Sequence, residues 1–279
     1  MSNARQWKCD LATYHADTSA VSHSGLDLVL EDPALYRHQR LLGNARESKP
    51  WFEEGQNLED ALLGGNGEVG SNLVVIPKEV LASNGARAGT KWKEFEAANA
   101  GKVLVKEGDP LINMIDAVLQ HDAARELFTA AGNRQETIVW HEDRFGVDVR
   151  CRFDFLHYGA EVAVDLKSTR TDASPRECAN ECAKFGYYRQ DDLYCRGSKE
   201  LYGVKTHFIF VFVAKDPPHR VETFELDDDF KRLGQEENDD ALATYAECRK
   251  TGIWLPRTHG RVIKLAAPGW LRFQKEWRA

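Results

Sequence analysis

The sequence lacks long apolar runs, and this absence excludes whole classes of protein. The most hydrophobic stretch is residues 208–214, FIFVFVA, which is too short to span a bilayer and predicts a buried β-strand. The first residues, MSNARQWKCDLATYHADTS, contain no apolar core of the kind that a secretory signal needs. We therefore expect no membrane association and a cytoplasmic location.

Cysteine is also scarce, with six residues in 279. Without an export signal, this content predicts reduced thiols and not a disulfide scaffold. Cys178, Cys182 and Cys195 lie close in sequence, and Cys9 could add a fourth ligand for an iron–sulfur cluster. The Cys-x3-Cys spacing differs from the compact patterns of such clusters, so we interpret these residues as small buried thiols.

Two further motifs are missing from the sequence. The nine histidines form no His-x3-His or His/Cys grouping that would demand zinc. No phosphate-binding loop of the form G-x4-G-K-[ST] is present, so any ATP-driven motor would have to be a separate chain.

The charge is unevenly distributed along the chain. The net charge is −7, and residues 227–240 carry seven acidic against two basic side chains, a balance of −5. The remainder is therefore near neutral, and local basic residues can still bind phosphate. Charge alone neither supports nor excludes a nucleic-acid partner.

The chain has no internal repeat and no low-complexity linker, and we expect one domain over residues 1–279. Its first part, about residues 20–128, is predicted to be helical. One helix is expected to start at Ser24 as its N-cap and to break at Pro33. The other helices are predicted over residues 57–63, 89–101 and 109–132, the last with Pro110 near its start and Gly132 as its stop.

The pattern changes to alternating apolar and polar residues after Gly132, in about residues 129–279. A helix from Ser174 to Gly197 is predicted there, because Ser174 and Glu177 form a capping box. Strands are expected over residues 136–143, 147–156, 161–169, 207–214 and 219–226, with a final helix over 239–250. This order predicts an α/β fold with a mixed central β-sheet flanked by helices.

One predicted strand carries an acid and a lysine two positions apart, in AVDLKSTR. Residues two apart on a strand point to the same face, so Asp165 and Lys167 project together while Val164 and Leu166 face the other way. Asp154 precedes Asp165 by eleven residues, near the end of the preceding strand. A hairpin between them would bring the two carboxylates side by side.

Two adjacent carboxylates repel each other unless a cation lies between them, and Mg²⁺ prefers such hard oxygen ligands. A neighbouring lysine can orient or deprotonate a metal-bound water and offset charge in a phosphoryl transition state. The Asp-x-Lys pattern alone is a weak signal, because it also occurs as a solvated ion pair. Its position in an apolar strand strengthens it, since unpaired charge there is costly.

Other polar residues surround this pattern. Gln190 and Tyr194 share one helix face and could position a phosphate. The simpler interpretation is that Tyr194 packs in the core and Gln190 is exposed to solvent. Arginines could contact phosphates or pair with local acids such as Asp143, Asp148 and Asp172. Phosphate contact is favoured for Arg170 and Arg189; the two interpretations stay open for Arg150 and Arg152, and Arg176 is a further candidate.

The segments RCRFDFL, EVAVDLKSTRTDASP and FGYYRQDDLY resemble the PD-(D/E)xK nuclease superfamily. They are most similar to the C-terminal nuclease domain of exodeoxyribonuclease VIII, the RecE type, and its phage-borne relatives. SGLDLVLEDPALY resembles the opening of that domain, and VFVAKDPPHRVETFELDDDFKRLG with LATYAECRKTGIWLP resembles its end. The resemblance extends over residues 22–270 and implies a restriction-endonuclease-like fold.

The resemblance implies roles for individual residues. Asp154 and Asp165 correspond to metal ligands, with the carbonyl of Leu166 as a further ligand, and Lys167 corresponds to the catalytic lysine. Gln190 and Tyr194 match the Gln-x3-Tyr motif of the family, and Glu136 matches an upstream acid. The cofactor implied is Mg²⁺ or Mn²⁺.

The chain departs from the family pattern at two positions. Phe153 replaces the usual proline before the first acid, which no chemical step requires. Glu59 stands where the family has the histidine of Gly-x3-His, here after Gly55. Glutamate is a hard ligand for Mg²⁺ or Mn²⁺, so the change predicts either an altered metal preference or a loss of activity.

The function that the resemblance implies is a metal-dependent 5′→3′ exonuclease on double-stranded DNA, of phage-type recombination. Its expected partners are DNA ends, a single-strand annealing protein and further copies of the chain in a ring, in a bacterial or phage-infected cell. The alternatives are an endonuclease or single-strand nuclease on the same fold, an inactive descendant that binds DNA or protein, and a globular protein in which Asp165 and Lys167 only pair.

Overall fold

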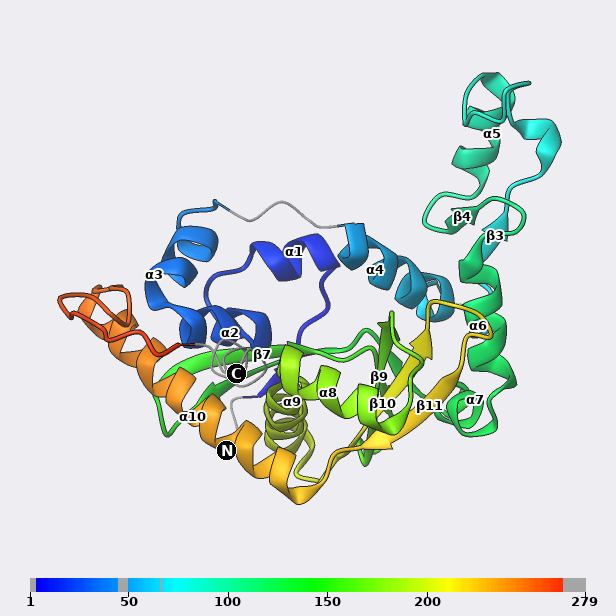
Figure 1. The fold of residues 1–279 in the computed structure, drawn as a ribbon. Helices are drawn as coiled ribbons and strands as arrows, with labels where there is room; N and C mark the ends of the chain where they lie inside the picture. The colour runs from blue at the N-terminus through cyan, green and yellow to red at the C-terminus, as the bar shows by residue number, and fades with distance from the viewer. Residues whose placement is uncertain (1–3, 45–49, 66, 268–279) are drawn as a thin grey trace, which may run out of the picture.

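A five-stranded mixed β-sheet carries the core of the structure, a computed structural model that describes residues 4–44, 50–65 and 67–267. Its two central strands run parallel, with Asp165 opposite Phe210, and the outer strands are antiparallel to their neighbours. Figure 1 shows this sheet below α4 and beside α6 and α7. The strands are, in spatial order, β11 (Val221–Glu225), β10 (His207–Ala214), β9 (Val162–Thr169), β8 (Phe155–His157) and β5 (Gly132–Arg134).

The sheet is apolar on both faces because each face is covered by helices. On β10, Phe208, Phe210 and Phe212 enter one hydrophobic core, and Val211 and Val213 enter the other. The first core is shared with α8 (Pro175–Phe185), α9 (Tyr187–Tyr202) and α10 (Asp228–Thr251); the second with α4 (Pro50–Leu63), α6 (Pro110–Gln120) and α7 (Asp122–Thr129). The predicted mixed sheet flanked by helices is confirmed.

A second sheet of four strands packs on the first core. It contains the predicted strand 136–143, but the predicted strand 147–156 is divided between the two sheets at Phe153 and Asp154. The backbone N–H of Phe153 donates to Glu136 and that of Gln135 donates to the Asp154 carbonyl, both across the corner. The second sheet contains, in order, β1 (Arg5–Gln6), β6 (Thr137–Glu142), β7 (Val147–Arg152) and β2 (Val21–Ser22).

The helix predicted from Ser174 to Gly197 is in fact two helices, α8 and α9. The chain turns at Gly186, whose φ of +69° suits glycine and where a Cβ atom would collide with the Arg189 guanidinium. Gly197 does not end the helix but lies inside α9, where a Cβ atom would be 2.8 Å from the Trp140 ring. Ser174 has the extended backbone of an N-cap, but its side chain makes no capping hydrogen bond, so the predicted capping box is wrong.

Other helix boundaries also differ from the prediction. The helix expected over residues 57–63 is α4, which begins at Pro50. Ser22, and not Ser24, caps α2 (His23–Glu31), because its hydroxyl accepts from the Gly25 N–H. The helix expected over 109–132 breaks at His121, whose ring caps α7. The final helix begins at Asp228, after the N-cap Asp227, and not at residue 239. None of the helices in the described ranges is long and apolar enough to cross a membrane. The break at Pro33 is confirmed, since it begins α3 (Pro33–Tyr36); α1 (Leu11–Ala16) and η1 (Arg37–Leu41) complete this part.

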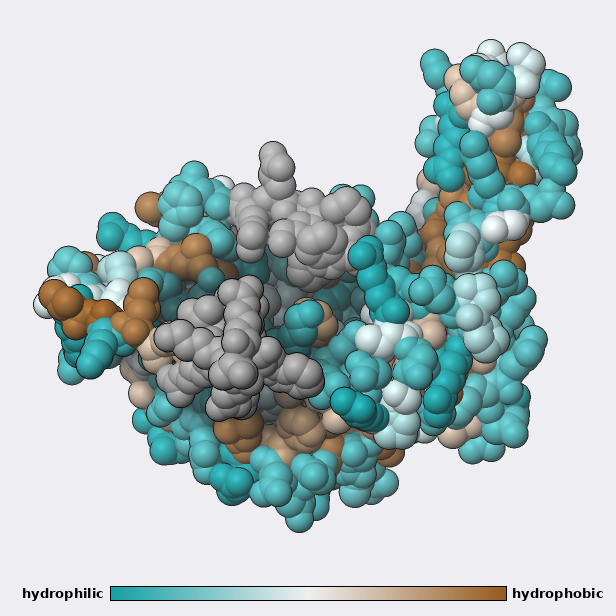
Figure 2. Space-filling view, in the orientation of Figure 1, coloured by the Kyte–Doolittle hydropathy of each residue, from teal (hydrophilic) through white to brown (hydrophobic). Residues whose placement is uncertain are grey.

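An arm projects from the body next to α6 (Figure 1). It is built on a parallel strand pair, β3 (Leu73–Val75) and β4 (Val103–Val105), with the short helix η2 (Lys78–Val80) and α5 (Thr90–Ala98) beyond it. Figure 2 shows a notch between the arm and the body. A cavity of about 980 Å³ lies there and is lined by residues of α4, the arm and the ends of β9 and β10.

Candidate active site

The face of β9 that covers the first core carries the two residues singled out by their spacing. Ala163 lies in that core while Val164 and Leu166 lie in the other, so Asp165 and Lys167 share one face. Asp165 is only 2% exposed, and its Oδ2 lies 2.5 Å from the Lys167 Nζ. This is a buried ion pair and not a solvated one.

Asp154 lies next to this pair. Phe155 pairs with Val164, which places Asp154 opposite Asp165 at the end of the β8–β9 hairpin, and its Oδ2 accepts a hydrogen bond of 2.8 Å from the Leu166 N–H. Burial, together with the nearby carboxylates of Glu59 and Asp165, raises the pKa of Asp154 well above its usual value. The hairpin therefore brings two carboxylates together, as the sequence predicts.

Helix α4 adds Glu59 as a third carboxylate. Burial raises the pKa of Glu59 to about 7; the charges of Asp60 and Asp165 act in the same direction, and a hydrogen bond from Gln135 opposes them. The amides of Gln135 and Gln56 donate to its two oxygens at 3.2 and 3.5 Å. The position that the family occupies with histidine is thus held by an acid that faces the other two.

The three carboxylates of Glu59, Asp154 and Asp165 exceed the one ammonium of Lys167. A divalent cation would balance this excess, and carboxylate oxygens are the ligands that Mg²⁺ and Mn²⁺ prefer, so the donor set fits such a cation. Across the described parts of the chain, no three acidic, His or Cys side chains converge on one point. Asp154 accepts a hydrogen bond from the Leu166 N–H and Asp165 contacts Lys167, so a bound cation would have to compete with these contacts.

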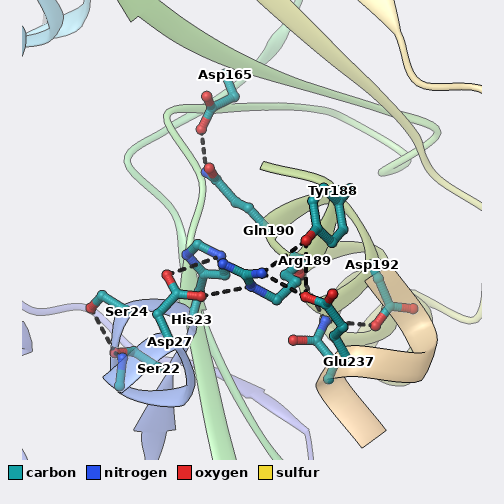
Figure 3. A network of polar contacts seen from close by, with 12 residues as sticks. Ser22, His23, Ser24, Asp27, Asp165, Tyr188, Arg189, Gln190, Asp192 and Glu237 are labelled. Atoms are coloured by element: carbon teal, nitrogen blue, oxygen red, sulfur yellow. Dashed lines mark hydrogen bonds and ion pairs between the residues drawn. The ribbon is translucent and has the colours of Figure 1, made fainter. Parts of the chain in front are cut away.

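Helix α9 presents Gln190 and Tyr194 to this face of the sheet. The Gln190 amide donates to Asp165 Oδ1 (Figure 3) and is buried, so the interpretation of Gln190 as a solvent-exposed residue is wrong. Tyr194 packs edge-on against Phe153 and Phe208, with ring centroids 5.0 and 5.6 Å away, and burial raises its pKa well above the usual value. Gln190 therefore contacts the carboxylates directly, whereas Tyr194 is a core residue beside them.

Two residues near Lys167 escaped the sequence analysis. The Lys167 Nζ lies 4.7 Å from the centre of the Tyr187 ring, and burial raises the pKa of that tyrosine to about 12. Tyr187 precedes Gln190 by one helical turn, and that spacing was the available signal. His23 at the start of α2 also lies nearby; it is half-buried, and this burial lowers its pKa.

Glu136, the other acid implied by the resemblance, lies in a separate polar network. Its carboxylate accepts hydrogen bonds from Gln6 at 3.1 Å, from Asn133 and from Tyr202. These donors lie on β1, on β5 and at the end of α9. The structure does not bring Glu136 into the carboxylate cluster, and its metal role stays a prediction.

The arginines divide into two groups. Arg189 is 17% exposed and lies between Asp27, at 2.8 Å, and Glu237, at 2.6 Å (Figure 3), which favours internal pairing over phosphate contact. Arg150 pairs with Asp17, and not with the acids considered from sequence. Arg152 donates to the Cys9 carbonyl and to Gln135, so it too is bound within the protein. The side chains of Arg170 and Arg176 are exposed.

Two cavities are lined by residues next to those of the carboxylate cluster. The cavity of about 980 Å³ beside the arm is lined by Asp60 of α4 and by Ser168 and Arg170, which follow Lys167. A second cavity, of about 630 Å³, is lined by Gln135 and Arg152 together with N-terminal residues. Gln135 of one lining donates a hydrogen bond to Asp60 of the other at 3.4 Å.

Comparison with known proteins identifies the family. None of the curated proteins matches the chain. A crystal structure of a protein from Eubacterium rectale, named a putative exonuclease, is 14% identical and has a TM-score of 0.64 over 94% of this chain and 97% of that one, which shows a shared fold. A second crystal structure, of SSO0001, is 14% identical over 67% of this chain and 84% of its own, with a TM-score of 0.26 that supports no argument. Residues 84–261 match the family described as PDDEXK-like domain of unknown function (DUF3799), and the chain therefore belongs to this family, a part of the PD-(D/E)xK nuclease superfamily.

Proposed function

We propose that the protein is a metal-dependent deoxyribonuclease. The observation that carries the proposal is the buried Asp165–Lys167 pair on β9 with Asp154, from the β8–β9 hairpin, and Glu59, from α4, beside it, so that three carboxylates meet one ammonium group. Structural ion pairs in protein interiors are usually balanced, so an unbalanced group of buried acids is typical of a functional site.

The residues of the site would have different roles in catalysis. Glu59, Asp154, Asp165 and the Leu166 carbonyl would hold a Mg²⁺ or Mn²⁺ ion, which supplies an activated water and a Lewis acid when bound. Burial opposes the charge on Lys167, but Asp165, Tyr187 and Asp154 outweigh it and hold the lysine pKa above its usual value. Lys167 is therefore a cation that can donate hydrogen bonds to water or phosphate oxygens and offset charge in the transition state. Gln190 would orient Asp165.

The substrate that we propose is the end of double-stranded DNA, degraded 5′→3′ to leave a 3′ single strand. The resemblance to the RecE-type nucleases supports this choice, and so does the shared fold with a protein named as an exonuclease. Phosphate contacts from exposed Arg170 and Arg176 fit sequence-independent binding. By analogy with that family, a single-strand annealing protein and a ring of identical chains are the proposed partners.

An inactive descendant that binds DNA or protein is the second candidate. The observation in its favour is that Lys167 and Asp165 close on each other while Glu59 replaces the family histidine. An endonuclease or a single-strand nuclease on the same fold is a third candidate that the same site chemistry allows.

End-labelled DNA distinguishes these candidates. We expect the metal-free protein, given Mg²⁺ or Mn²⁺, to release label first from the 5′ ends of linear duplex DNA and to leave covalently closed circular DNA intact. Cleavage of the circle would identify an endonuclease, preference for single strands would identify a single-strand nuclease, and no cleavage of any substrate with either metal would favour the inactive descendant.

A further inference from the structure

Gln135 occupies an unusual place in the site, although no sequence motif singles it out. It is one of four residues other than glycine in the described chain with a positive φ, at +52°, a conformation that costs energy for a residue with a side chain. It precedes β6 at the corner where the chain passes between the two sheets. Such a backbone persists only where surrounding contacts hold it.

The contacts of Gln135 join three parts of the site. Its backbone N–H donates to the Asp154 carbonyl at 2.9 Å. Its side-chain Nε2 donates to Glu59 Oε1 at 3.2 Å and to Asp60 Oδ1 at 3.4 Å, on helix α4. Its Oε1 accepts from the Arg152 guanidinium at 3.1 Å. One residue therefore connects the backbone of one carboxylate residue to the side chain of another.

The chemistry of these partners fixes which way the amide faces. A guanidinium only donates hydrogen bonds, so the atom of Gln135 that meets Arg152 has to be the carbonyl oxygen. The amino group then faces Glu59 and Asp60, which as carboxylates accept. Arg152 is in turn held by the Cys9 carbonyl and the Thr137 hydroxyl, so the orientation of the amide does not depend on Glu59 itself.

A second glutamine provides an internal comparison. Gln56 also donates to Glu59, at 3.5 Å, and to Asp60, at 3.2 Å. Gln56 lies on the same helix as both acids, three and four residues before them, so it fixes neither acid relative to the rest of the site. Gln135 reaches α4 from 75 residues further along the chain.

We propose that Gln135, oriented by Arg152, is a positioning residue that sets the location of Glu59 relative to Asp154 for the binding of a divalent cation. The inference rests on the proposed function, because it assumes that these carboxylates hold the cation. Residues that orient metal ligands in this way typically change metal affinity by about 10- to 100-fold when removed. Gln135 would act through Glu59 and would not itself touch the metal or the substrate.

Calorimetric titration of the metal-free protein with Mn²⁺ tests the proposal without relying on activity. The variants are Gln135→Gly and Gln56→Ala. Glycine removes the amide but accepts the positive φ, so the fold is not expected to suffer at this position, and thermal unfolding without metal checks this. We expect Gln135→Gly to weaken Mn²⁺ binding by about tenfold or more and Gln56→Ala to change it less than threefold.

Each outcome separates the inference from the function on which it rests. Wild-type binding with no loss in Gln135→Gly, or equal losses in both variants, would overturn the positioning role and leave the metal site standing. No Mn²⁺ binding by the wild type would overturn the metal site itself. Arg152→Ala offers a second measurement, because it keeps the Gln135 amide but frees its orientation, and we expect it to weaken Mn²⁺ binding in the same direction as Gln135→Gly.

Discussion

Helix α9 carries charged neighbours on two sides, and the two sides differ in how their charges are matched. Toward α2 and α10, four carboxylates each touch a guanidinium: Arg189 contacts Asp27 and Glu237, and Arg196 contacts Asp192 and Asp239. We call these six residues the arginine network. Toward the sheet, Gln190 faces the carboxylate cluster of Glu59, Asp154 and Asp165, where Lys167 is the one ammonium group.

This difference in charge balance distinguishes a network that stabilises the fold from a cluster that we propose to be functional. The arginine network joins three helices and leaves no carboxylate without a cation, as expected of polar groups kept for structure. Burial raises the pKa of Asp192 in the arginine network too, but Arg196 and Asn238 oppose that shift. In the carboxylate cluster, neighbouring carboxylates add to the effect of burial and raise the pKa of Glu59 and Asp154 further, so the charged form of the cluster is held at a cost. Such a cost is typical of a site that an external cation completes.

The largest contrast is expected between activity and stability at Asp154. Asp154→Asn removes a proposed metal ligand, so nuclease activity should fall by about 10³-fold or more. The same change removes a buried charge whose pKa is raised, so the free energy of unfolding at pH 8 should rise by about 1 kcal/mol. Denaturant titration and an assay on duplex DNA measure the two effects. A variant that stays active, or one that unfolds more easily, would contradict the assignment.

The arginine network should respond in the opposite way. Arg189→Ala leaves the half-buried carboxylates of Asp27 and Glu237 without their cation, and we expect it to lower the free energy of unfolding by about 2 kcal/mol. Exposed Arg176 serves as the matched control, with less than about 0.5 kcal/mol for Arg176→Ala. If Arg189→Ala were as stable as the wild type and lost only DNA affinity, Arg189 would be the phosphate contact that the sequence suggested.

Asp191 tests whether unbalanced acids outside the cluster behave like those within it. Burial raises its pKa from 3.8 to about 6, and its Oδ2 has no hydrogen-bond partner. The folded state therefore holds this proton more tightly than the unfolded chain, so the contribution of Asp191 to stability is complete below about pH 4 and is lost as the pH rises through 6.

The wild type should accordingly lose about 2 kcal/mol relative to Asp191→Asn between pH 4 and pH 7. Chemical denaturation of both proteins at several pH values measures the difference. A difference that does not change with pH would mean that Asp191 ionises normally in the fold.

The smallest effect is expected at Arg170. Its exposed side chain lines the cavity beside the arm and directly follows β9. Arg170→Ala should weaken DNA binding a few-fold and reduce the slope of log affinity against log salt by about 1, with stability unchanged. Arg232→Ala, at the acidic start of α10, is the control and should leave the slope as it is. An equal slope for both variants would remove Arg170 from the binding surface.

Local pattern predicted the parts of the site that depend on one strand or one turn. The alternation in AVDLKSTR gave the shared face of Asp165 and Lys167, and the spacing to Asp154 gave the hairpin. The resemblance added Gln190, which periodicity alone left in solvent. Each of these relations is set within about forty residues of sequence.

Features that depend on contacts between residues distant in sequence could not be predicted from local pattern. The sequence suggested that Gly197 ends a helix. In the structure it lies inside α9, where Trp140 of β6 packs against it and leaves no room for a Cβ atom. Gly186 was predicted to lie inside a helix, but the chain turns there. The start of α10 was not predicted, because its first residues are acids whose roles, capping the helix or pairing with arginines, depend on the fold. Gln135 has no motif, because its role depends on Glu59, which precedes it by 76 residues.

The measurement that most directly tests the central claim compares wild type with Lys167→Ala on linear duplex DNA, with Mg²⁺, Mn²⁺ or EDTA, after thermal unfolding has shown both proteins to be folded. We predict degradation by the wild type with metal, none with EDTA, and a loss of about 10²-fold or more in the variant. Equal rates for the two proteins, or degradation that persists in EDTA, would contradict the assignment of β9 as the catalytic strand.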